Sequence, residues 1–94
     1  MSVQISPEVF RARLKQAMRI PEFGALALEL TAVTETRYST PEHPAFSLLL
    51  RGPLDPQLEQ RIYAFEFADA TTMEIFIVPV ARDASGMQYE AVFN

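Results

Sequence analysis

His43 is the single histidine of the sequence and the first candidate for chemistry, because imidazole titrates near neutral pH and can act as a general base. It lies between two prolines in Pro41-Glu42-His43-Pro44, with Tyr38 and Ser39 shortly upstream. Adjacent side chains of an extended segment point in opposite directions, so Glu42 is poorly placed to orient the ring. We interpret His43 as a solvated loop residue. A zinc site needs several ligands at defined spacing, so we expect no metal and no cofactor.

The carboxylates are scattered along the chain and form no recognisable motif. Glu29, Glu66, Glu74 and Glu90 occupy polar positions of predicted strands, where solvation or protection of a sheet edge explains them. A catalytic pair would need one carboxyl group with a raised pKa in a cleft, and no sequence pattern indicates one. Cysteine is absent, which excludes disulfides, thiolate metal sites and cysteine catalysis. The three glycines form neither a phosphate-binding loop nor a nucleophile elbow.

The charge distribution argues against nucleic acid as a partner. Eight basic residues stand against twelve acidic ones, a net charge of −4, whereas a nucleic-acid binder needs a cationic surface. Four of the basic residues fall between positions 8 and 19, against one acidic residue. On a helix, Arg11, Lys15 and Arg19 would form one ridge at i, i+4 spacing. That ridge would either bind an acidic protein, an anionic lipid surface or a phosphate, or pack beside the acidic sheet of its own chain.

The candidate partner-binding residues are this ridge and two positions beside the proline-rich loop that follows Gly52. They are Arg11, Lys15, Arg19, Arg51 and Asp55. Loops of this kind often carry binding contacts, although most only connect strands.

One predicted helix precedes the rest of the fold. Ser6-Pro7-Glu8 is typical of a helix start, because serine caps the first turn and proline suits the first helical position. Phe10, Leu14, Ala17 and Met18 then follow a period of 3.6, and Pro21 and Gly24 end it. We place the helix at about 7–19.

From Leu26 onward the apolar period changes to two, which predicts strands. We place five, at about 26–35, 45–51, 61–68, 73–81 and 87–93. No connection is helical and most are short, so the sheet should be antiparallel, largely a meander. The fold class is α+β and β-rich, one domain over 1–94, with a small roll or a partly closed barrel as alternative forms of the sheet.

The fourth predicted strand is apolar on both faces. Ile75 and Ile77 point one way, and Phe76 and Val78 the other. A sheet with one wet side would not tolerate this, so something should cover the second face: the helix, closure of the sheet, or a partner subunit. Pro79 cannot donate to the ladder and predicts a bulge or an edge position.

No segment indicates export or membrane insertion. Met1 to Ile5 has neither a cationic nor an apolar signal region. The longest apolar run, Ile75 to Ala81, is far shorter than the roughly 20 residues of a membrane-spanning helix. We expect a cytoplasmic protein.

Several segments resemble a small bacterial domain family of unknown function. They are Phe46–Pro53, Tyr63, Ile75–Val80 and the final Tyr89-Glu90-Ala91-Val92-Phe93-Asn94. The resemblance implies a stand-alone domain encoded near phage-tail-collar-like proteins, hence a part in a tail-like or fibre-like assembly. It supplies no catalytic residues. This chain departs from the family pattern at Arg61-Ile62-Tyr63, which has no glycine before the strand.

Three functional hypotheses follow. The first is a non-enzymatic protein–protein interaction or self-association module, because the fourth strand has two apolar faces and no catalytic constellation is evident. The second is a small-molecule-binding barrel with Tyr63, Phe65, Tyr89 and Phe93 as an aromatic lining. The third is an enzyme that uses His43 with a carboxylate or Tyr38.

Overall fold

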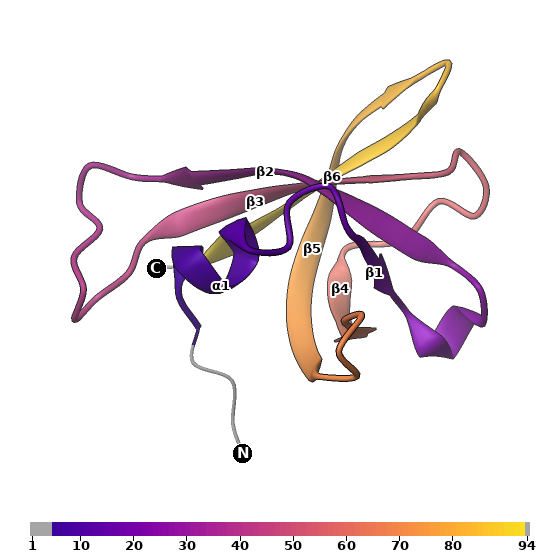
Figure 1. The fold of residues 1–94 in the computed structure, drawn as a ribbon. Helices are drawn as coiled ribbons and strands as arrows, with labels where there is room; N and C mark the ends of the chain where they lie inside the picture. The colour runs from indigo at the N-terminus through magenta and orange to yellow at the C-terminus, as the bar shows by residue number, and fades with distance from the viewer. Residues whose placement is uncertain (1–4, 94) are drawn as a thin grey trace.

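The computed structural model describes residues 5–93, and it is built almost entirely of strands (Figure 1). The expectation that the chain starts without a signal region concerns positions 1–4, which lie outside the described residues, as does Asn94. One short helix, α1 (Pro7–Arg11), comes first, and a single 3-10 turn, Pro21–Phe23, joins the first two strands. The strands are β1 (Ala17–Arg19), β2 (Ala27–Glu35), β3 (Phe46–Gly52), β4 (Arg61–Glu66), β5 (Thr72–Asp83) and β6 (Gly86–Phe93).

The six strands form one closed antiparallel sheet in the order β1-β2-β3-β6-β5-β4, with β4 also paired to β1. Strands β1-β2-β3 make one meander and β4-β5-β6 a second, and the two meet at the β3–β6 and β1–β4 junctions. The predicted antiparallel, β-rich architecture is therefore confirmed. The predicted meander is found within each half of the sheet. The β3–β4 connection then carries the chain from one half to the other, because β3 pairs with β6 and not with β4.

The predicted helix over 7–19 is wrong beyond Arg11. Ser6 caps the first turn as expected, since its Oγ accepts a hydrogen bond from the amide of Val9 at 3.4 Å. Lys15 then adopts a left-handed φ of 70°, and its amide donates to the carbonyl of Leu30 in β2 at 2.8 Å. The following residues extend along β2 as β1.

The cause of this error lies in Met18, an apolar residue that suits both the helical and the strand period. Met18 and Ile20 are fully buried, whereas Arg19 between them is exposed, which is the alternation of a strand. Leu14, assigned to the helical stripe, keeps 37% of its surface exposed. Pairing with β2 and β4 gives residues 17–19 a hydrogen-bonded place in the sheet, and such tertiary contacts override local helix preference.

The other strand predictions are confirmed within two residues, and β1 is the sixth strand that they lacked. The core is a single cluster on the inner face of the closed sheet. Phe10 of α1 packs against one end of it, with ring centroids 5.8 Å from Phe46 and 5.6 Å from Phe93. Phe46 and Phe93 in turn stack at 4.8 Å. The helix is thus held by one buried aromatic side chain rather than by a long apolar stripe.

Pro79 lies where the β5–β6 register shifts, between the pairs Pro79–Tyr89 and Ala81–Gln88. The predicted bulge is therefore confirmed. Beyond it, the pair Asp83–Gly86 closes a hairpin whose loop is Ala84-Ser85, and Gly86 takes a φ of +156° that residues with a side chain rarely adopt.

Candidate functional site

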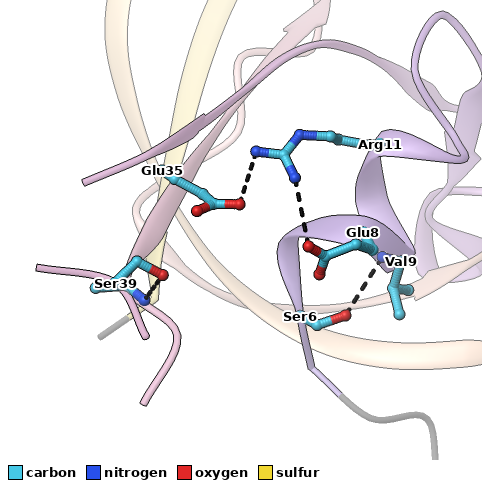
Figure 2. A network of polar contacts seen from close by, with 7 residues as sticks. Ser6, Glu8, Val9, Arg11, Glu35 and Ser39 are labelled. Atoms are coloured by element: carbon cyan, nitrogen blue, oxygen red, sulfur yellow. Dashed lines mark hydrogen bonds and ion pairs between the residues drawn. The ribbon is translucent and has the colours of Figure 1, made fainter. Parts of the chain in front are cut away.

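Arg11 is committed to a polar network between α1 and β2 (Figure 2). Its Nη2 lies 2.8 Å from Oε1 of Glu35 in β2, and its Nη1 lies 3.6 Å from Oε1 of Glu8 in the first turn of α1. One guanidinium therefore bridges two carboxylates that come from different elements. The network fastens the short helix to the sheet and neutralises both acids.

A cavity of about 350 Å³ opens beside this network, between the start of α1 and the β2–β3 connection. Its walls are hydroxyl, carboxylate and proline side chains: Ser6, Pro7, Glu8, Glu35, Ser39, Thr40, Pro41 and Pro44. All three hydroxyls already accept main-chain hydrogen bonds: Ser6 from Val9, Ser39 from Ala45 and Thr40 from His43. The polar groups of this cavity thus serve mainly to hold the chain.

The ridge of Arg11, Lys15 and Arg19 does not form, because α1 ends at Arg11. Lys15 lies in the left-handed turn before β1. Arg19 lies in β1, where its Nη2 is 2.8 Å from Oε1 of Glu66 in β4. Two of the three cations therefore form intramolecular ion pairs, with partners in β2 and in β4.

Arg51 and Asp55 also have different surroundings. Arg51 reaches from β3 to the β5–β6 hairpin, with Nη2 2.9 Å from Oδ1 of Asp83 and a further contact to the hydroxyl of Ser85. Hydrogen bonds from the Ser85 hydroxyl and amide, with the charge of Arg51, lower the pKa of Asp83. Asp55 is exposed on the β3–β4 connection. The structure therefore does not gather the five predicted residues into one surface.

His43 is exposed in the β2–β3 connection, and its amide donates to Oγ1 of Thr40 at 3.0 Å. The turn is held by main-chain bonds in both directions between Thr40 and His43. Over residues 5–93 no group of three or more His, Asp or Glu side chains is arranged to hold a metal ion.

The four aromatic residues predicted to line a pocket pack into the core or fasten loops. Tyr63, Phe65 and Tyr89 are at most 2% exposed, and Phe93 stacks on Phe46. The Tyr89 hydroxyl accepts the buried amide of Leu58 at 2.9 Å, and the Tyr63 hydroxyl donates to the carbonyl of Glu59 at 2.7 Å. The two tyrosines hold the β3–β4 connection against the sheet. Ligand binding by these rings stays a prediction.

The outer face of β4 and β5 carries an exposed apolar surface, of which the sequence pattern indicated only a part. Ile62 and Phe76 are register partners across the two strands, 56% and 43% exposed. Val78 follows two residues after Phe76 on the same face and is half-buried. We call Ile62, Phe76 and Val78 the outer strip. The two-faced pattern of residues 75–78 pointed to Phe76 and Val78, but only the β4–β5 register adds Ile62.

Two carboxylates flank the outer strip. Glu90 of β6 is the register partner of Val78, and Glu74 precedes Phe76 by two residues, opposite Ala64 of β4. Neither forms an ion pair with any residue in the range 5–93, and no lysine or arginine occupies the neighbouring outward positions of β4 to β6. The strip is thus apolar with negative charge at two of its margins.

The protein is a small domain with a closed six-stranded antiparallel sheet, an internal core and an apolar outer strip. Neither of the helical segments within residues 5–93 is long and apolar enough to cross a bilayer. The model of a domain of unknown function, DUF6916, matches residues 5–93, so the chain belongs to that family. Comparison with curated proteins and with solved structures finds no match.

Proposed function

We propose that this domain is a non-enzymatic protein–protein interaction module that binds its partner through the outer strip. The observation that carries the proposal is the exposed pair of Ile62 and Phe76, aligned across β4 and β5 on the outside of the sheet. Of the covers considered for the second face of β5, the helix packs elsewhere, against Phe46 and Phe93, and closure of the sheet leaves this face outward. A partner is the remaining cover.

The energetics favour an interface at this position. Complete burial of an exposed isoleucine or phenylalanine contributes about 1.5–3 kcal/mol, and Ile62 and Phe76, which are 56% and 43% exposed, would gain about half of that on association. Aromatic and aliphatic anchors that are buried on association carry most of the energy of an interface. Exposed apolar side chains that neighbour one another on a rigid sheet pay little ordering entropy on binding.

The polar residues support the same conclusion. Most arginines form ion pairs within the chain, with Glu8, Glu22, Glu35, Glu66, Asp69 and Asp83. His43 is exposed, and it lies in a connecting turn. The resemblance noted from the sequence adds a role in a tail-like or fibre-like assembly to the proposal. An enzyme built on His43 is the less favoured alternative, since no described contact orients its ring.

The experiment compares capture by the immobilised domain with capture by the variant Ile62→Thr/Phe76→Thr, using extract of the native cell. Threonine retains strand preference while it removes most of the apolar surface. Leu14→Thr is the matched control, because Leu14 is also exposed but lies in the turn between α1 and β1. Circular dichroism spectra and thermal unfolding curves check that the wild type and both variants are folded.

We expect the wild type and Leu14→Thr to capture the same proteins, including further copies of the domain itself. The amount captured by the double variant should be at least tenfold lower. Equal capture by all three folded proteins would reject the outer strip as the binding surface.

A further inference from the structure

The β2–β3 connection carries an exposed aromatic residue next to a cation. Tyr38 is 72% exposed. The guanidinium of Arg37 lies over its ring at 4.9 Å from the centroid, and Nη2 of Arg37 donates to the Tyr38 hydroxyl at 2.7 Å. We call Arg37 and Tyr38 the knob. Within residues 5–93, Arg37 forms no ion pair with a carboxylate.

The turn that carries the knob is held in place by hydrogen bonds. The amide of Thr36 donates to the carbonyl of Ala45 at 2.9 Å, and the amide of Ser39 donates to the carbonyl of Thr36 at 3.1 Å. The amide of Tyr38 donates to Oγ1 of Thr36 at 3.3 Å. A side chain on an ordered turn loses less conformational freedom on binding than one on a mobile loop. The knob is therefore presented to solvent in a defined position.

The knob and the outer strip are complementary in chemistry. The strip offers Ile62 and Phe76 to an aromatic ring, and Glu74 and Glu90 at its margins lack a cationic partner in the described part of the chain. The knob offers an aromatic ring together with a guanidinium. Lys15 and Arg82 also lack a described carboxylate partner, but neither has an aromatic ring beside it.

The two surfaces lie on different parts of the molecule. The β2–β3 connection extends to one side of the fold, away from β4 and β5 (Figure 1). A knob therefore reaches the strip of a second copy more readily than its own. A contact between two different surfaces of identical chains is head-to-tail, and it continues into a chain of subunits unless the rotation closes a ring.

We propose that the occupant of the outer strip is the Arg37–Tyr38 knob of a second copy of this chain. Tyr38 packs on Ile62 and Phe76, and Arg37 pairs with Glu74 or Glu90. The proposal rests on the outer strip being an interface and specifies its partner. Because the contact includes opposite charges, added salt weakens it.

Sedimentation velocity of the purified domain over a concentration series tests this. We expect the sedimentation coefficient of the wild type to increase with protein concentration. In 0.5 M NaCl this increase should require a higher protein concentration. The knob variant Arg37→Gln/Tyr38→Ser and the strip variant Glu74→Lys/Glu90→Lys should each raise the dissociation constant at least tenfold. Leu14→Thr should behave as the wild type.

Mixing the two variants gives the decisive measurement. The knob variant keeps an intact strip and the strip variant keeps an intact knob, so an equimolar mixture should form a 1:1 dimer that grows no further. A knob variant that still self-associates would show a symmetric strip-to-strip contact and overturn the proposal. A wild type that stays monomeric would overturn it too, while a strip-dependent capture of another protein would leave the interaction module intact.

Discussion

Arg19 and Glu66 face each other across the junction at which the sheet closes. They are register partners of β1 and β4, and Nη2 of Arg19 lies 2.8 Å from Oε1 of Glu66. β1 contributes three residues, the shortest of the described strands. The junction therefore depends on few backbone bonds, and a cross-strand pair of opposite charge contributes to holding it.

Reversing one charge of this pair should destabilise the domain, and reversing both should restore it. Arg19→Glu places like charges opposite each other, and the expected loss in the free energy of unfolding is about 0.5–1 kcal/mol. The double variant Arg19→Glu/Glu66→Arg should recover most of that loss. Urea unfolding of the four proteins of the cycle measures it.

The ion pair between Arg61 and Glu22 provides the matched control, since it joins β4 to the 3-10 turn rather than to β1. The loss in the free energy of unfolding caused by Arg61→Glu should simply add to the loss caused by Arg19→Glu. Glu66→Arg should not restore the stability that Arg61→Glu removes. If the double charge reversal at positions 19 and 66 is as unstable as the sum of the single changes, the pair does not support closure.

Removing one hydroxyl should reveal how the β3–β4 connection is anchored. Tyr89→Phe leaves the amide of Leu58 without its partner in a residue that is 3% exposed. An unsatisfied buried amide costs about 1–3 kcal/mol. Tyr63→Phe removes a bond to the carbonyl of Glu59, an exposed residue, and water can replace it. We expect a clearly larger loss of stability for Tyr89→Phe in urea unfolding; equal losses would contradict this assignment.

Gly52 marks a close approach between β3 and β2. A Cβ at this position would overlap Cδ2 of Leu28, so the buried leucine side chain would have to shift within the core. Gly52→Ala should therefore cost about 1–3 kcal/mol through overpacking. The shorter side chain of Leu28→Val should return part of that loss in the double variant, so the two changes should be non-additive. Strict additivity in thermal or urea unfolding would show that the overlap is not the cause.

Two carboxylates, Asp69 and Asp83, should make the free energy of unfolding fall as the pH is lowered. The pKa of Asp83 is lowered by hydrogen bonds from Ser85, and the pKa of Asp69 by hydrogen bonds from Thr71, with Arg51 and Arg13 as the nearby charges. A carboxyl group with a lowered folded-state pKa stabilises the fold above its ordinary value of 3.8, and this contribution is lost as pH falls through the lower value.

Ser85→Ala should raise the pKa of Asp83 and leave that of Asp69 unchanged, and Thr71→Val should do the reverse. Carboxyl chemical shifts followed by NMR from pH 7 to pH 2 measure both. In each variant the loss of melting temperature in acid should be smaller than in the wild type. A pKa of Asp83 that is the same with and without the Ser85 hydroxyl would contradict the prediction.

Local patterns predicted much of the sheet. Side chains alternate across a strand whatever the strand pairs with, so the period of two located β2 to β6 within two residues. Pro79 lacks an amide hydrogen, which predicted a bulge or an edge position, and the β5–β6 register shifts at this residue. Phe10 was placed on the apolar stripe of the predicted helix, and it is fully buried.

The candidate site was less accessible to sequence reasoning. Phe76 and Val78 drew attention as a second apolar face, but Ile62 joins them only through the β4–β5 register. The cationic ridge failed because its geometry assumed a helix that ends four residues before Lys15. Ion-pair partners such as Glu35 for Arg11 lie in distant strands, where spacing along the chain carries no information.

The sequence by itself determined that this chain is an antiparallel, β-rich domain with a capped helix at its start, because strand alternation and capping depend on residues a few positions apart. Tertiary structure decided that residues 17–19 form a strand, that Arg19 meets Glu66 to close the sheet, and that Ile62 lies beside Phe76. Each of these depends on which distant segments become neighbours, and that follows from the packing of the whole core rather than from any local period.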